Sequence, residues 1–121
     1  MDDDYSYVDP AARLYFDLFV IEAQNRGINL DYSRVKIGFV SLSGNTAGET
    51  DFKRNRILID STSGLWRASP EILVFHELGH LILNRDHVQG HPSIMNPGGI
   101  IVTFYYADRD KYVDELFNVV N

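Results

Sequence analysis

The sequence has no cysteine, no long apolar run and few basic residues, and each of these absences excludes a class of protein. Without cysteine, the 121-residue chain has neither a disulfide framework nor a thiolate metal site. No stretch approaches the roughly 18 consecutive apolar residues of a membrane span. Only 11 Lys and Arg residues stand against 17 Asp and Glu, and they form no basic stripe, so nucleic acid is not an expected partner.

Length and composition fit one compact domain. Of the 121 residues, 45% are hydrophobic, which is enough for a single core over residues 1–121. The formal net charge of −6 favours solubility, and we expect a monomer. Residues 1–8 are acidic, and we expect them to be loose.

Two helices are expected near the ends of the chain. Asp9-Pro10 provides a capping carboxylate followed by proline at the first helical position, and Gly27 ends the helix. Asp108 is expected to cap the last helix. The apolar residues at helical spacing are Leu14, Leu18, Phe19 and Ile21 in the first helix, where Phe16 and Val20 widen the apolar face, and Tyr112, Val113, Leu116, Phe117 and Val120 in the last.

Apolar and β-branched residues predict a small sheet between these helices. Residues 35–42 and Arg56–Asp60 are typical of strands, and the polar segment 43–51 is typical of a loop. Residues 100–106 fit either a strand or a packed wall. Together with the helices, this predicts a mixed α/β (α+β) fold with a small twisted sheet.

A third helix carries the most specific motif. Ser69-Pro70-Glu71 starts it, and it should run to about Leu83. It contains His76-Glu77-Leu78-Gly79-His80, an H-E-x-x-H motif that puts two imidazoles on one helix face, where they can share a Zn²⁺. Glu77 can take a proton from a water that the metal activates. The helix is apolar nearly all round, so burying these residues would be costly unless they were paired or metal-bound.

A catalytic zinc usually has three protein ligands, so two histidines are not enough. The candidates for the third are Asp86, His87, His91 and a carboxylate far downstream. On a continued helix, His87 would lie about 10.5 Å beyond His80, too far to share an ion. Asn84 readily adopts the left-handed conformation that closes a helix, which would let the chain bring His87 back to the metal.

The stretch from His76 to Pro97 resembles the site of a metzincin-type zinc peptidase, H-E-x-x-H-x-x-G-x-x-H followed by a Met-turn. Here the spacing to the third histidine is one residue longer, and Asn84 stands where the turn glycine is usual. Counted strictly, the third-ligand position falls on Asp86, and some metzincin relatives use Asp there. We favour His87, because Met95 follows it at the distance seen in matrixins.

The chain is also similar to a group of small bacterial zincin-like peptidases. The similarity extends from Asp9-Pro10 through Arg56–Asp60 and Trp66 to residues 114–117. It implies a minimal zincin fold, in which a twisted sheet accompanies an N-terminal helix, a buried zinc helix, a Met-turn and a C-terminal helix. Members of this group are often exported or lipid-anchored, so we expect export or a cell-envelope location, with Met1 replacing a trimmed signal.

The resemblance implies a hydrolase that cleaves peptide bonds in a peptide or protein substrate with one zinc ion. His76, His80 and His87 would bind the metal, Glu77 would act as general base, and Met95 would form an apolar floor beneath the site. The family also implies an edge strand along which substrate docks. Arg56–Asp60 is a candidate for this role, and the alternative is that these residues form an ordinary strand paired on both sides.

Two alternatives keep the zinc. In the gluzincin manner, Glu115 or Asp114 would be the third ligand. In the other, the chain is a zincin-like module that binds zinc or a protein without turnover, since 121 residues leave little material for a deep specificity pocket.

Four aromatic residues have weaker claims to a function. We expect Trp66 to cover the core and not to line a cleft, because a single tryptophan is more often found in that role. We expect His91 to be an exposed loop residue. Tyr105 or Tyr106 is a candidate hydrogen-bond donor to an oxyanion, although no motif carries that role over.

Overall fold

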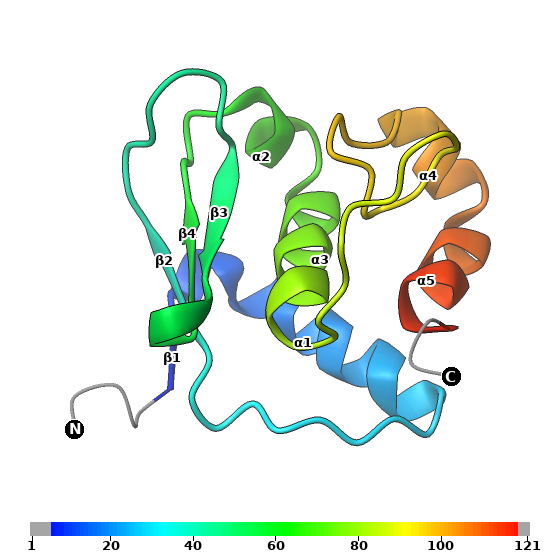
Figure 1. The fold of residues 1–121 in the computed structure, drawn as a ribbon, viewed down its shortest axis with the longest axis horizontal. Coiled ribbons are helices and arrows are strands. Elements are labelled where there is room, and N and C mark those ends of the chain that lie inside the picture. The colour runs from blue at the N-terminus through cyan, green and yellow to red at the C-terminus, as the bar shows by residue number, and fades with distance from the viewer. Residues whose placement is uncertain (1–5, 119–121) are drawn as a thin grey trace.

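The computed structural model describes residues 6–118 and has a mixed α/β architecture, as the sequence predicts. A four-stranded sheet lies at one end of the molecule, and the five α-helices of the described residues pack beside it (Figure 1). The buried apolar residues form one cluster. Within residues 6–118, no helix is both long and apolar enough to cross a membrane.

The sheet has the order β1-β2-β4-β3. Its strands are β1 (Tyr7–Val8), β2 (Lys36–Phe39), β4 (Arg56–Ile59) and β3 (Gly48–Asp51). The first three are parallel, with Ile37 opposite Ile57, and β3 is antiparallel to β4. Ile37, Ile57 and Ile59 are fully buried, so β-branched side chains fix the central register.

Three expectations about the sheet are wrong. Residues 56–59 are not an edge strand, because β4 has a partner on each side. The edge strand beside β4 is β3, which lies in the segment 43–51 that we expected to be a loop, and β1 forms the opposite edge. Tyr7 and Val8, expected to be loose, pair with β2. Residues 1–5 lie outside the described part of the chain.

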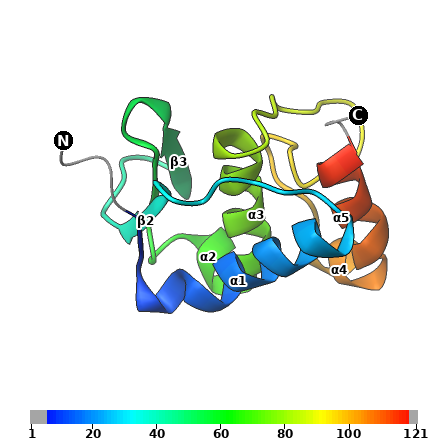
Figure 2. The same ribbon diagram turned by 90° about the horizontal axis from the view of Figure 1, so that it is seen from below.

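The first helix, α1 (Pro10–Asn25), begins as predicted. The Asp9 carboxylate accepts a hydrogen bond from the Ala11 amide at 2.9 Å. Its buried face is formed by Ala12, Phe16, Phe19 and Ala23, whereas Leu14 and Ile21 are exposed, contrary to expectation. Figure 2 shows α1 running beneath α2 (Gly64–Ala68) and α3 (Pro70–Leu81).

The motif helix α3 is the buried centre of the fold. Ser69 Oγ accepts from the Ile72 amide at 3.3 Å, and Pro70 is the first helical residue, as predicted. One side of α3 packs against β3 and β4 and another against α1. Its buried residues include Glu71 and Glu77 as well as apolar side chains.

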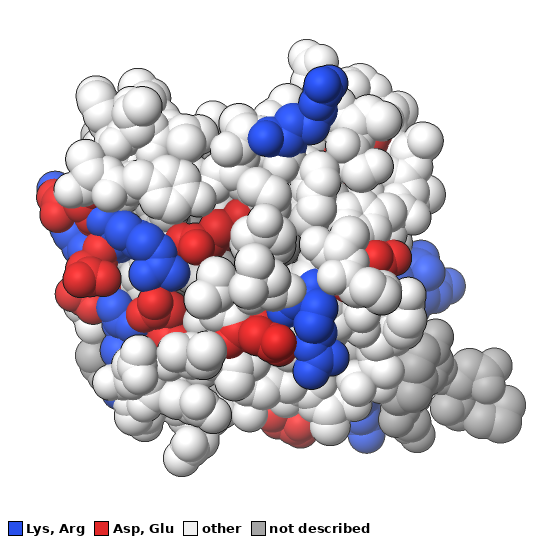
Figure 3. Space-filling view, turned by 180° about the vertical axis from the view of Figure 1, so that it is seen from behind, with Lys and Arg blue, Asp and Glu red and all other residues white. Residues whose placement is uncertain are grey.

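The chain ends in two helices, α4 (Val102–Ala107) and α5 (Arg109–Asn118). Residues 102–106 are therefore helical and form no strand. Asp108 lies between the two helices, and its carbonyl accepts from the Lys111 amide at 3.1 Å. The predicted core residues Tyr112, Val113, Leu116 and Phe117 are buried, and Val120 lies outside the described residues. On the face shown in Figure 3, acidic and basic side chains are interspersed.

Candidate metal centre

Three histidines converge beside α3. His76 and His80 come from one face of that helix, and His87 comes from the loop after it. The ring centroids are 4.8 Å apart for His76 and His80, 4.8 Å for His80 and His87, and 5.3 Å for His76 and His87. One nitrogen from each ring lies within 4.8 Å of the others, so the three could hold a metal ion.

His87 reaches the cluster because the helix stops and the chain reverses. Asn84 has a φ of 56°, which confirms the predicted left-handed residue. The Arg85 amide then donates to the Gly79 carbonyl at 2.9 Å and closes the helix end. Asp86 and His87 are both exposed, but only His87 lies in the histidine cluster, so the geometry favours His87 between these two candidates.

Backbone carbonyls orient two of the three imidazoles. His76 Nδ1 lies 2.7 Å from the Ile94 carbonyl oxygen, and His80 Nδ1 lies 2.8 Å from that of Arg85. A carbonyl only accepts, so each Nδ1 carries the proton and each Nε2 keeps its lone pair for a metal. Burial lowers the pKa of His76 to about 4, which keeps this ring neutral near pH 7.

Glu77 is buried beside the cluster and held by the edge strand. Thr50 Oγ1, on β3, donates to Glu77 Oε1 at 2.8 Å. Burial raises the pKa of the Glu77 carboxyl, and the Thr50 hydrogen bond and the nearby His80 offset only part of that effect. A base whose pKa is raised toward neutrality is better matched to proton transfer at pH 7.

Gly48 lets the edge strand approach this carboxylate. A Cβ at Gly48 would lie 3.1 Å from Glu77 Oε2, 3.1 Å from Leu73 Cδ1 and 3.3 Å from the Leu58 carbonyl oxygen. Sequence reasoning missed both Thr50 and Gly48. The stretch Gly-Glu-Thr-Asp is poor in strand-forming residues, and only Thr50 hints at a strand.

A cleft of about 770 Å³ opens over the histidines and Glu77. Residues 45–50 line one side of the cleft and residues 96–100 another, while α3 contributes Ile72 and Leu73 beside the polar groups. In Figure 1, β3 and the chain after residue 95 lie on either side of α3. The cleft therefore brings an open strand edge next to the candidate metal ligands.

Met95 packs directly against the motif helix. Its side chain is fully buried, and a Cβ at Gly79 would lie 2.5 Å from Met95 Sδ. Gly79 is thus the position in the motif that allows this approach. The Met95 amide donates to Ser93 Oγ at 3.0 Å, and its carbonyl accepts from the Val88 amide at 3.0 Å, which ties this turn to the loop that carries His87.

The other candidate residues lie elsewhere. Asp114 pairs with Arg26 at 2.6 Å, and Glu115 pairs with Arg85 at 3.1 Å, so neither joins the histidine cluster. His91 is exposed and also lies outside the cluster.

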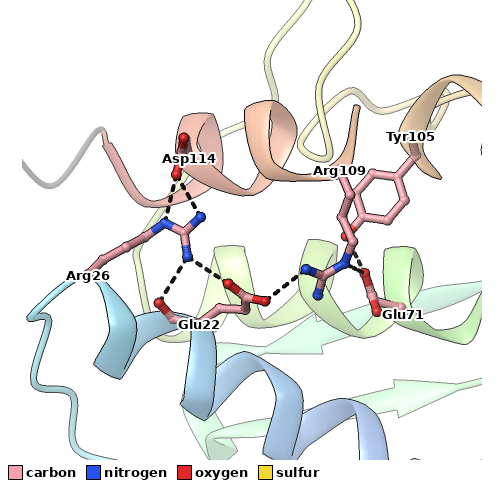
Figure 4. A network of polar contacts seen from close by, with 6 residues as sticks. All are labelled: Glu22, Arg26, Glu71, Tyr105, Arg109 and Asp114. Carbon is pink, nitrogen blue, oxygen red and sulfur yellow. Dashed lines mark hydrogen bonds and ion pairs between the residues drawn. The ribbon is translucent and has the colours of Figure 1, made fainter. Parts of the chain in front are cut away.

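The other three aromatic candidates, Trp66, Tyr105 and Tyr106, do not line the cleft. The Tyr105 hydroxyl donates to Glu71 (Figure 4), and that of Tyr106 bonds to Ser69 Oγ at 2.8 Å. The suggested oxyanion role is therefore not supported for either tyrosine. Trp66 packs edge-on against Tyr15 and Phe39, as expected of a core cover.

The donor set suits a divalent metal of the zinc type, because the candidate ligands are imidazoles oriented by carbonyls. Because one nitrogen of each ring lies within 4.8 Å of the others, small side-chain movements would bring all three donors onto one ion. Comparison with models of protein families, curated protein sequences and solved structures gives no match to this chain.

Proposed function

We propose that the chain is a zinc-dependent peptidase of the zincin type, with a metzincin-like site. The observation that carries this proposal is the pairing of three clustered histidines with a buried carboxylate, Glu77, at the floor of one cleft. A structural metal site would need no adjacent buried carboxylate. Burial raises the pKa of Glu77, which suits a general base better than an ordinary exposed carboxylate.

Each residue has a role in the proposed reaction. His76, His80 and His87 hold the metal through their imidazole nitrogens. The Nδ1–H groups of His76 and His80 donate hydrogen bonds to backbone carbonyls. When bound, zinc supplies Lewis acidity that activates water and polarises the scissile carbonyl. Glu77 accepts the proton of the attacking water and returns it to the leaving amine.

Edge strand β3 is the proposed docking surface for an extended peptide. Only one side of β3 pairs within the sheet, with β4, and its residues line the cleft. A substrate strand could add to the open side through main-chain hydrogen bonds, which tolerate many side chains. This role belongs to residues 48–51 and not to residues 56–60.

One observation favours the alternative of a zinc-binding module without turnover. Among the described residues that line the cleft, there is no tyrosine, lysine or arginine. The developing oxyanion would then depend on the metal and on backbone or amide donors, of which Asn96 is one candidate.

The test compares wild type with Glu77→Gln for zinc content and for cleavage of a mixed peptide library. We expect one zinc per chain in both, and cleavage that falls at least ~100-fold in the variant because the base is lost. His87→Ala should lose zinc, and Asp86→Ala should keep it. Equal peptide cleavage by Glu77→Gln and wild type, or none by zinc-loaded wild type, would contradict the peptidase proposal.

A further inference from the structure

The two carbonyls that orient His76 and His80 belong to separate segments. The His80 acceptor is the Arg85 carbonyl, in the loop that closes α3. The His76 acceptor is the Ile94 carbonyl, in the turn around Met95. The ring orientation of both histidines therefore depends on how these two segments are held.

One carboxylate on α5 contacts both segments. Glu115 Oε2 accepts from Arg85 Nη2 at 3.1 Å. Glu115 Oε1 accepts from Ser93 Oγ at 2.7 Å, and the same Ser93 Oγ accepts from the Met95 amide at 3.0 Å. Glu115 thus links Arg85, whose carbonyl orients His80, to Ser93. Ser93 directly precedes Ile94, whose carbonyl orients His76.

The Arg85 side chain strengthens the link to α5. Its Nη1 donates to the carbonyls of Glu115 and Leu116, at 3.1 Å each, near the end of the helix. Only 6% of the Arg85 side chain is exposed, so its charge depends on these acceptors. Removing the Glu115 carboxylate would leave a buried guanidinium with only carbonyl partners.

We propose that Glu115 is a positioning residue for the metal centre. It fixes the two segments whose carbonyls select the tautomer and orientation of His76 and His80, and it does so without binding the ion. Its two oxygens accept from Arg85 and Ser93, and Glu115 is not a member of the histidine cluster, so it acts on the site through these two segments. The inference rests on the proposed metal centre but not on turnover.

The neighbouring residue Asp114 offers a matched control. It lies on the same helix and carries the same charge, but it pairs with Arg26 toward α1. Alanine is the best helix former, so Glu115→Ala and Asp114→Ala perturb α5 itself alike. Only Glu115→Ala disconnects Arg85 from Ser93.

The experiment measures Zn²⁺ affinity by competition with a chromogenic chelator on the full chain. We expect Glu115→Ala to bind zinc about 10–100-fold more weakly than wild type, the usual effect of losing an outer-shell partner. Asp114→Ala should stay within about threefold. Glu115→Gln keeps an acceptor for Arg85 and should fall between Glu115→Ala and wild type.

Two further readouts separate positioning from loss of stability. The absorption bands of bound Co²⁺ should shift in Glu115→Ala and stay unchanged in Asp114→Ala, because only the first alters ligand orientation. Glu22→Gln breaks contacts to Arg26 and Arg109, none of which lines the cleft, and should destabilise the chain without weakening zinc binding.

Zinc affinity in Glu115→Ala within threefold of wild type would overturn the positioning role, as would an equal loss of affinity in Glu22→Gln. Tight zinc binding by wild type without any peptide cleavage would overturn the proposed peptidase function and leave the role of Glu115 standing.

Discussion

At the residue scale, Glu77 depends on a hydroxyl from another element. Only 4% of Glu77 is exposed, and burial raises the pKa of its carboxyl group. The hydrogen bond from Thr50 stabilises the charged form and also fixes Oε1 in place. The edge strand that we propose for substrate docking would thereby also orient the base.

Thr50→Val tests this contact, because valine keeps the shape of threonine and removes the donor. We expect kcat to fall about tenfold with KM nearly unchanged, since the base loses a partner and the substrate does not. The acid limb of the pH–rate profile should move to higher pH, because a cause that lowers the Glu77 pKa is gone. Thr50→Ser should restore wild-type kinetics. Wild-type kcat in Thr50→Val would argue against the contact.

At the element scale, the sequence predicted α3 well because several local signals agree there. The Ser69 cap, Pro70, the apolar pattern and the Asn84 stop all concern residues close in sequence, and the structure bears them out. The position of His87 in the histidine cluster was predicted from the same helix end at Asn84.

Elements that depend on distant contacts were predicted less well. The strand β3 carries Gly, Glu and Asp, and it is extended because β4 offers a pairing edge. The helix α4 contains Val102, Thr103 and two adjacent tyrosines, so its composition suggested a strand. Buried Tyr105, bonded to Glu71, shows the tertiary contact that accompanies the helix. In α1 the predicted apolar face was wide, and tertiary packing decides that Phe16 and Phe19 are buried while Leu14 and Ile21 are exposed.

Gly79→Ala tests the packing of α3 on the turn around Met95. Alanine alone would favour a helix by about 1 kcal/mol, but overpacking a fully buried contact costs typically about 1–3 kcal/mol. We expect a net loss of about 1 kcal/mol in the unfolding free energy of the metal-free chain, measured with urea. Adding Met95→Ala should relieve the contact with Met95 Sδ.

Gly64 is the control for this substitution, because a Cβ there meets nothing within 4 Å. We expect Gly64→Ala to be neutral or slightly stabilising. If Gly79→Ala were as stable as Gly64→Ala, the close approach of Met95 would not limit the motif helix.

At the scale of the whole molecule, a charge network joins α1, α3 and α5 (Figure 4), and none of its residues lines the cleft. Arg109 on α5 donates to Glu71 on α3 at 2.7 Å and to Glu22 on α1 at 2.8 Å. Arg26, the residue that caps the end of α1, donates to Glu22 at 2.7 Å and to Asp114 on α5 at 2.6 Å. One network thus fixes α1 and α5 against the helix that carries the site.

Arg109→Leu removes the cation common to two of these carboxylates. Glu71 is only 6% exposed and would keep Tyr105 as its main partner, so we expect a loss of about 3 kcal/mol in unfolding free energy near neutral pH. The control is Lys111→Leu, whose exposed charge should matter by less than about 0.5 kcal/mol. Both are measured by urea unfolding of the metal-free chain.

The pH dependence of that loss identifies its cause. Burial alone would raise the pKa of Glu22, but hydrogen bonds from Arg109 and Arg26 outweigh it, so the pKa lies below its ordinary value of 4.5. The unfolded chain therefore takes up this proton first, and the stabilisation is full above pH 4.5 and declines as the pH falls through the folded-state value. Arg109→Leu already lacks part of this stabilisation. The unfolding free energy of Arg109→Leu should consequently approach that of wild type on acidification. A difference in unfolding free energy that stayed constant with pH would instead point to lost packing on Phe75, because the Arg109 guanidinium lies 5.9 Å from the centre of that ring.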